Sequence, residues 1–180
     1  ARNVSALAGV DLVAVTAAGC SAHMAEYGNW AENGEDLARR SSDITRVVAG
    51  LIEEGALPRL EPNRGKVAVQ DPCHLRHAQR ETAAQRTIVS AAGYEVVDVD
   101  PTGMCCGAAG IYSLLYPDAS SELGGRKASE VEATGTTIVA SANPGCEMQL
   151  RQHLPNWYTI SHPIELYRDA LADRVPASAG

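Results

Sequence analysis

Short runs of aliphatic and β-branched residues alternate with longer amphipathic stretches along this chain. The short runs predict strands at residues 11–16, 66–70, 94–99, 136–141 and 157–160. The longer stretches predict helices at residues 20–27, 35–54, 81–92, 117–133, 144–153 and 163–172. Strands that alternate with helices of this length form βα units, so the pattern predicts an α/β fold with a mostly parallel sheet.

Two segments of the chain resemble each other without gaps. Residues 9–20 align on residues 135–146, and glycine, valine, alanine, glycine and cysteine match in register. Both segments read as a helix end, a strand, and then Gly-Cys opening a helix. The match is either a chance similarity between two βα units or a tandem duplication, and we expect the two segments to be equivalent. The prolines and glycine of residues 57–65 predict a linker, and residues 175–180 predict a frayed tail.

Composition and charge narrow the class of protein. Of the 180 residues 45% are hydrophobic but only 4% are aromatic, so the core must be aliphatic. The net charge of −7 argues against a nucleic-acid surface, which needs a basic face. No apolar run has the length of a membrane span, and no secretory signal is visible. The chain opens without Met in what reads as the middle of a helix, which predicts a fragment or a processed form of a longer protein.

The cysteines carry the most specific pattern. Cys105 and Cys106 are adjacent in a glycine-rich segment, Cys73 precedes them in Asp-Pro-Cys-His, and Cys146 follows in Asn-Pro-Gly-Cys. Adjacent cysteines are poorly suited to a disulfide with each other. Each of these positions follows a predicted strand, and the carboxyl ends of parallel strands meet at one edge of a sheet. We therefore expect the four thiols to converge there, with helices that begin near Ala108 and Cys146 directing backbone N–H groups at them.

Three interpretations of these thiols stay open, and the pattern favours the third. They are buried structural cysteines, ligands of a structural zinc ion, or ligands of an iron–sulfur cluster. Zinc sites usually use Cys-x-x-Cys pairs, and this chain has none. The five cysteines cannot all pair within the chain, which favours a reducing cytoplasm. Further candidates are Cys20, either a lone thiol or a fifth ligand, and Tyr112 and Asn143 as hydrogen-bond donors around the ligands. His74 and His77 either tune the site or carry protons, or they cap a helix or face solvent.

Three motifs together resemble the cysteine-rich CCG domain of the glycolate oxidase iron–sulfur subunit. They are Asp-Pro-Cys-His-Leu at 71–75, Cys-Cys-Gly-Ala-Ala-Gly-Ile-Tyr at 105–112 and Asn-Pro-Gly-Cys at 143–146. Lactate-utilisation proteins, the anaerobic glycerol-3-phosphate dehydrogenase iron–sulfur subunit and a heterodisulfide reductase component share this domain. The resemblance starts near residue 17 and continues to residue 166. It implies that residues 1–60 are the end of a first CCG unit with a connecting helix, and that residues 61–180 are a second unit with the cysteine site.

The resemblance also implies a cofactor and its ligands. Cys73, Cys105, Cys106 and Cys146 match the family's ligand positions, and a [4Fe–4S] cluster is the implied cofactor. Asn143 stands where the fuller family pattern has another cysteine. That departure favours a cluster with four cysteine ligands over the five-cysteine cluster of the heterodisulfide reductase branch.

The implied function is electron transfer in an oxidoreductase, with no catalytic residue in this chain itself. A flavin-containing dehydrogenase subunit would oxidise a 2-hydroxy acid such as glycolate, and electrons would pass through iron–sulfur centres to a quinone or another acceptor. Its partners would be that subunit and the rest of its own longer chain or a first CCG unit. The setting would be the cytoplasm, or the inner face of the cell membrane through these partners. The alternatives are a heterodisulfide-reductase-like thiol/disulfide module and a structural zinc-binding domain.

Overall fold

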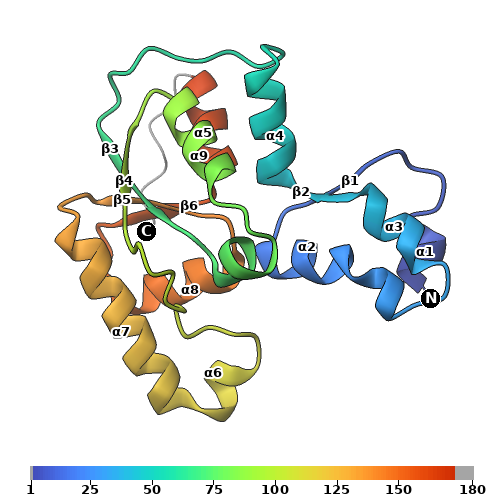
Figure 1. The fold of residues 1–180 in the computed structure, drawn as a ribbon. Helices are drawn as coiled ribbons and strands as arrows, with labels where there is room; N and C mark the ends of the chain where they lie inside the picture. The colour runs from blue at the N-terminus through green and yellow to red at the C-terminus, as the bar shows by residue number, and fades with distance from the viewer. Residues whose placement is uncertain (1, 173–180) are drawn as a thin grey trace.

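A computed structural model describes residues 2–172, so the tail expected to be frayed lies outside the described residues. Its larger sheet is parallel, with the strand order β4-β3-β5-β6 (Figure 1). The strands are β3 (Lys66–Gln70), β4 (Glu95–Asp98), β5 (Ile138–Ser141) and β6 (Thr159–Ser161). This α/β architecture with alternating strands and helices confirms the fold class that the hydrophobic pattern predicts.

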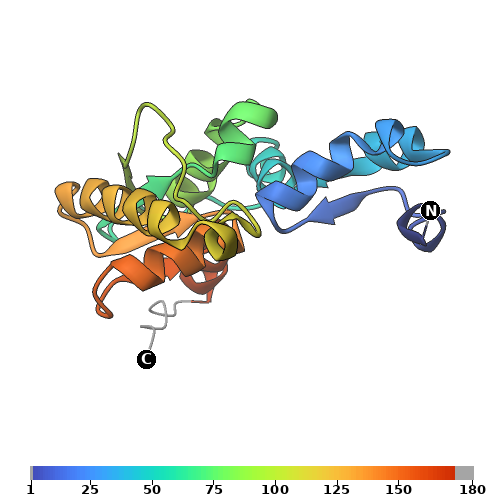
Figure 2. The same ribbon diagram turned by 90° about the horizontal axis from the view of Figure 1, so that it is seen from below.

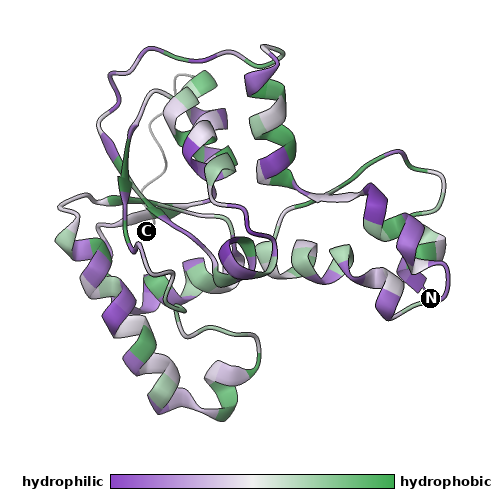
Figure 3. Ribbon diagram, in the orientation of Figure 1, coloured by the Kyte–Doolittle hydropathy of each residue, from purple (hydrophilic) through white to green (hydrophobic). Residues whose placement is uncertain are grey.

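Helices cover both faces of this sheet (Figures 1 and 2). On one face lie α4 (Ile44–Glu53), α5 (Ala83–Ala91) and α9 (Pro163–Leu171), and on the other lie α7 (Pro117–Ala133) and α8 (Pro144–His153). Val67 and Val69 of β3 pack on the first layer, whereas Ala68 between them packs on the second. Strands that are buried on both faces are hydrophobic throughout rather than alternating (Figure 3).

A second, smaller sheet lies beside the first. It pairs β1 (Val13–Val15) with β2 (Ser41–Asp43) in parallel. The helices around it are α1 (Arg2–Ala6), α2 (Ala18–Ala25), the 3₁₀ turn η1 (Tyr27–Asn29) and α3 (Gly34–Arg40). This part extends away from the larger sheet (Figures 1 and 2), and residues 54–65, which belong to no helix or strand, connect α4 to β3 as the linker prediction requires. Among the described helices, none is long and apolar enough to cross a membrane.

The single long helix predicted for residues 35–54 is wrong. The structure interrupts it with β2, which pairs with β1. Ser41 and Asp43 explain the break, because short polar side chains compete with helical hydrogen bonds. The Ser41 hydroxyl donates to the Leu37 carbonyl at 2.7 Å, and the Asp43 carboxylate accepts from the Thr45 backbone N–H at 3.0 Å, which caps the start of α4.

The repeat predicted from residues 9–20 and 135–146 is confirmed at the level of local structure. Both segments are a strand that enters a helix, β1 into α2 and β5 into α8. The N-cap residues fall on the same aligned position, Ala17 and Asn143, and both are extended. The two turns also touch, since the Ala18 N–H donates to the Ala142 carbonyl at 3.2 Å. A two-fold relation between the two whole units stays a prediction.

Two short helices near the cysteines differ from the sequence-based expectation. The helix expected to begin near Ala108 is wrong, because the next helix, α6, covers only Tyr112–Leu115. The residues before it bend sharply instead, with positive φ at Gly107, Ala109 and Gly110. After Cys73 the chain forms a short π-helix, η2 (His74–Ala78), which the sequence pattern did not indicate.

Candidate metal centre

The ends of three neighbouring parallel strands bring the four cysteines together. Cys73 follows β3, Cys105 and Cys106 follow β4, and Cys146 follows β5. Because β4, β3 and β5 are adjacent and parallel, their carboxyl ends meet at one edge of the sheet. The predicted convergence of these thiols is therefore confirmed, and their role as ligands stays a prediction.

The four cysteines line one cavity, and two of their sulfurs are in direct contact. Cys106 Sγ lies 3.0 Å from Cys146 Sγ, and Cys105 lies close enough to Cys106 and Cys73 for their thiols to shift its pKa. Cys106 and Cys146 are buried, whereas Cys73 and Cys105 are partly exposed, and all four are free thiols. The site thus has an inner buried pair and an outer pair that solvent can reach.

The contacts divide these thiols into two protonation classes. Hydrogen bonds from Cys106 and Cys73 lower the pKa of Cys105, and a hydrogen bond from Cys106 lowers the pKa of Cys146. The pKa values of Cys73 and Cys106 are raised, first by their hydrogen bonds to these acceptors and then by burial. Cysteine ligands bind metal as thiolates, so these thiols would release protons when metal binds.

A cavity of about 370 Å³ opens beside these sulfurs. Both parts of the chain line it, because Ala17, Gly19 and Cys20 from the start of α2 face the four cysteines of the larger part. The candidate Cys20 is exposed and lies at the wall of this cavity. Most of the other lining residues are alanine and glycine. The site therefore spans the proposed boundary between the two units.

Of the three polar candidates Asn143, His74 and Tyr112, two lie at the cysteine site and one does not. Asn143 reaches the site, since its side-chain N–H₂ group donates to Cys146 Sγ at 3.5 Å and its oxygen accepts from the Gly19 N–H at 3.3 Å. His74 Nδ1 lies 3.6 Å from Cys73 Sγ, at the cavity wall. Tyr112 stacks on Tyr116 instead, with ring centroids 5.1 Å apart, and is not among the cavity's lining residues.

Backbone hydrogen bonds and a buried ion pair hold the loop that leads to Cys105 and Cys106. Asp100 accepts hydrogen bonds from the backbone N–H groups of Thr102 and Met104. Lys127 Nζ, which is 1% exposed, contacts the same carboxylate at 2.6 Å. Burial alone would raise the pKa of Asp100, but hydrogen bonds from Lys127 and Thr102 outweigh it and hold that pKa well below its usual range. This charged pair anchors the loop to α7.

The donor set fits an iron–sulfur cluster. Such clusters take thiolate ligands on several iron atoms, so the thiols need to surround a small volume rather than meet at one point. Backbone and side-chain N–H groups already face the sulfurs, including the Gly107 N–H at 3.4 Å from Cys105 Sγ. The first residues of α8 and α2 line the cavity, where helix N-termini favour a negatively charged group. Within residues 2–172, no three Cys, His, Asp or Glu side chains converge as the ligands of a single metal ion do.

Sequence reasoning missed two residues that shape this site, Gly19 and Arg76. Gly19 binds Asn143, and a Cβ atom at its position would contact both Asn143 and His74. Arg76 and His77 contact the loop before Cys105. The gapless repeat was a usable signal for Gly19, because it aligns with Gly145 beside Cys146. No comparable sequence signal marks Arg76, whereas the position of His77 close to Cys73 already made it a candidate.

Comparison with known proteins agrees with this geometry. Residues 67–151 match the model of the cysteine-rich CCG domain, and this span contains all four converging cysteines. The chain is 32% identical to the glycolate oxidase iron–sulfur subunit of Escherichia coli, over 91% of this chain and 41% of that protein. It is 29% identical to the probable glycolate oxidase iron–sulfur subunit of Bacillus subtilis, over 83% of this chain and 36% of that protein.

A relative of a second kind is also similar. The chain is 29% identical to a component of the dihydromethanophenazine:CoB–CoM heterodisulfide reductase of Methanosarcina barkeri, over 77% of this chain and 36% of that protein. The chain thus spans about two fifths, or less, of the length of these curated relatives. Together, the domain match and the relatives support an iron–sulfur redox module of the oxidoreductase type.

Proposed function

Because the chain carries a cysteine-rich CCG domain, we propose that Cys73, Cys105, Cys106 and Cys146 hold a [4Fe–4S] cluster at the carboxyl edge of the larger sheet. The observation that carries this proposal is the convergence of four free thiols on one cavity from three parallel strand ends. When bound, such a cluster supplies reversible one-electron transfer. The N–H groups that face the sulfurs stabilise negative charge there and so raise the reduction potential.

The larger assignment is an electron-transfer module of a flavin-linked oxidoreductase that acts on a 2-hydroxy acid of the glycolate type. The names of the E. coli and B. subtilis relatives support this assignment. The partner is a flavin-containing dehydrogenase subunit, and the acceptor is a quinone or a similar carrier. Residues 1–60 act as the end of a first CCG unit and residues 61–180 as the second. The module works in the cytoplasm, or at the inner face of the membrane through its partners.

A second candidate function is thiol/disulfide reduction at the cluster. It is favoured by the heterodisulfide reductase relative and by the exposed Cys20 thiol at the wall of the same cavity. In this function a disulfide substrate, rather than a quinone, would accept the electrons. The two functions therefore differ in which acceptor reoxidises the loaded chain.

We expect the acceptor to distinguish them in a direct experiment. The chain is reconstituted anaerobically with iron and sulfide, reduced with photoreduced flavin, and mixed in a stopped-flow instrument with a soluble quinone or a small disulfide. Electron transfer predicts rapid reoxidation by the quinone and no reaction with the disulfide beyond that of free reduced flavin. The reverse order of reactivity would replace the electron-transfer assignment with the thiol/disulfide one.

A further inference from the structure

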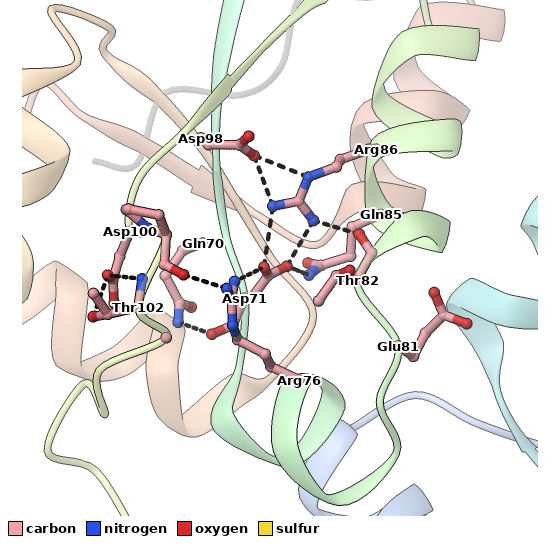
Figure 4. A network of polar contacts seen from close by, with 12 residues as sticks. Gln70, Asp71, Arg76, Glu81, Thr82, Gln85, Arg86, Asp98, Asp100 and Thr102 are labelled. Carbon is pink, nitrogen blue, oxygen red and sulfur yellow. Dashed lines mark hydrogen bonds and ion pairs between the residues drawn. The ribbon is translucent and has the colours of Figure 1, made fainter.

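A buried carboxylate, that of Asp71, lies at the centre of a polar network two residues before Cys73. The Asp71 side chain is 3% exposed, and Figure 4 shows four hydrogen bonds converging on it. Arg86 binds it with both terminal nitrogens, each at 3.0 Å. Gln85 Nε2 donates to it at 2.9 Å and Arg76 Nη1 at 3.0 Å. The Asp71 carboxylate accepts all four of these hydrogen bonds, and they fix the orientation of the three donor side chains.

Of the two arginines that bind Asp71, only Arg76 also contacts the loop that leads to Cys105. Arg76 Nη2 donates to the carbonyl of Pro101, and a Cβ atom at Gly103 would collide with the Arg76 side chain. His77 Nε2 lies 3.0 Å from the Gly103 carbonyl, which can only accept, so this nitrogen carries the proton. Arg76 and His77 therefore hold the Pro101–Gly103 turn through two of its carbonyl groups. This turn ends two residues before Cys105. Arg86 instead continues to Asp98 at the end of β4.

Arg76 and His77 lie on the short helix that directly follows Cys73. Cys73 is the N-cap of η2, and Arg76 and His77 follow within that π-helical turn. π-Helical turns are rare and occur frequently at functional sites. A rigid element that carries Cys73 at one end and holds the paired-cysteine loop at the other fixes the separation between the two ligand segments.

We propose that Arg76, oriented by Asp71, is a positioning residue that holds the Pro101–Gly103 turn, and with it Cys105, against Cys73 before any cluster binds. The proposal rests on the proposed function, in which these thiols are cluster ligands. Its physical basis is preorganisation, since ligands that already lie together lose less freedom when iron arrives. The placement of Cys105 and Cys73 at the wall of the same cavity is the feature that Arg76 maintains.

The test measures thiol proximity in the metal-free chain. Two reporter chains are made by Cys→Ser substitution, one that retains only Cys73 and Cys105 and one that retains only Cys106 and Cys146. Each is treated with dibromobimane, which becomes fluorescent when it bridges two neighbouring thiols. Arg76→Met should slow bridging of Cys73 to Cys105 about tenfold, because charge-assisted hydrogen bonds that hold the loop are lost. Bridging of Cys106 to Cys146 should stay unchanged, because the Ser120 hydroxyl holds the carbonyl of the next residue, Gly107, at 2.9 Å independently of Arg76. This second rate therefore reports that the fold is intact.

Arg86→Met is the matched control. It removes the same charge from the same carboxylate but no contact with the Pro101–Gly103 turn. It should leave the Cys73–Cys105 bridging rate within about twofold, and Arg76→Lys should recover part of the rate because it keeps the charge near Asp71. Equal slowing in Arg76→Met and Arg86→Met would overturn the proposal, because the effect would then be general loosening. An unchanged rate in Arg76→Met would overturn it as well.

A second variant covers the case in which Arg76→Met does not fold. His77 is exposed, and His77→Ala removes the other contact with the same turn. It should slow bridging in the Cys73–Cys105 reporter but not in the Cys106–Cys146 reporter, and no change in either would count against the proposal. Because the assay uses no iron, its outcome is independent of whether the wild-type chain takes up a cluster. Failure of positioning and failure of the proposed function are therefore separate results.

Discussion

Cys106→Ser is expected to abolish the uptake of iron and sulfide by the chain. Cys106 is 2% exposed and its Sγ lies 3.0 Å from that of Cys146, so it is the most buried thiol of the set. A serine hydroxyl at this buried position is a harder and less readily ionised ligand than a thiolate, and no other side chain replaces it. The measurement is iron per chain and visible absorption after anaerobic reconstitution.

Cys20→Ser is the control for that experiment. Cys20 aligns with Cys146 by the repeat, but it lies at the cavity wall and belongs to the other part of the chain. Its substitution should leave the iron content and the spectrum nearly as in the parent. Equal loss of iron in both variants would identify Cys20 as a ligand and would favour a five-cysteine site. Full iron content in Cys106→Ser would contradict the ligand set.

Lys127→Ala is expected to lower the free energy of unfolding by about 3–5 kcal/mol, because it leaves a buried carboxylate without its partner. The Lys127 side chain is 1% exposed and that of Asp100 is 6% exposed. Chemical denaturation of the metal-free chain measures the change. Arg126→Ala is the matched control, since its neighbouring ion pair with Glu122 is exposed on both sides, and it should change stability by less than about 1 kcal/mol. Similar losses in the two variants would contradict this view of the buried pair.

The same pair predicts a dependence on pH. The pKa of Asp100 is lowered in the folded chain, so its contribution to stability is complete above the unfolded value of about 3.9. It is lost as the pH falls below that value towards the lower folded pKa. The stability of the parent should therefore fall more steeply below about pH 4 than that of Lys127→Ala. Parallel acid profiles of the two chains would argue against the assignment.

Much of the fold followed from periodicity because the elements concerned are long or sharply bounded. Proline and the hydrophobic pattern gave the bounds of α7 and α8, and a compact apolar run gave those of β3. β2 was missed because its residues Ser41–Asp43 contain no apolar side chain, and only pairing with β1 makes them a strand. A strand of this kind is determined by tertiary contacts and has no local signal.

Some features of the site could likewise be predicted from the sequence, and others could not. Convergence of the cysteines followed from the rule that parallel strands end at one edge, which needs only the order of elements. The role of Cys20 in lining the cavity required knowledge of how the two sheets sit beside each other, although the repeat pointed to it. The contact of Arg76 with the Pro101–Gly103 turn depends on a π-helix and on the orientation of the Arg76 side chain. Neither has a periodicity that the sequence reveals.

Counting iron and acid-labile sulfide in the reconstituted wild-type chain, together with its visible spectrum during a redox cycle, tests the central claim most directly. The proposed site predicts about four iron and about four sulfide per chain, with absorption that bleaches on reduction and returns on reoxidation. A colourless protein with stoichiometric zinc would contradict the claim, as would bound iron without sulfide.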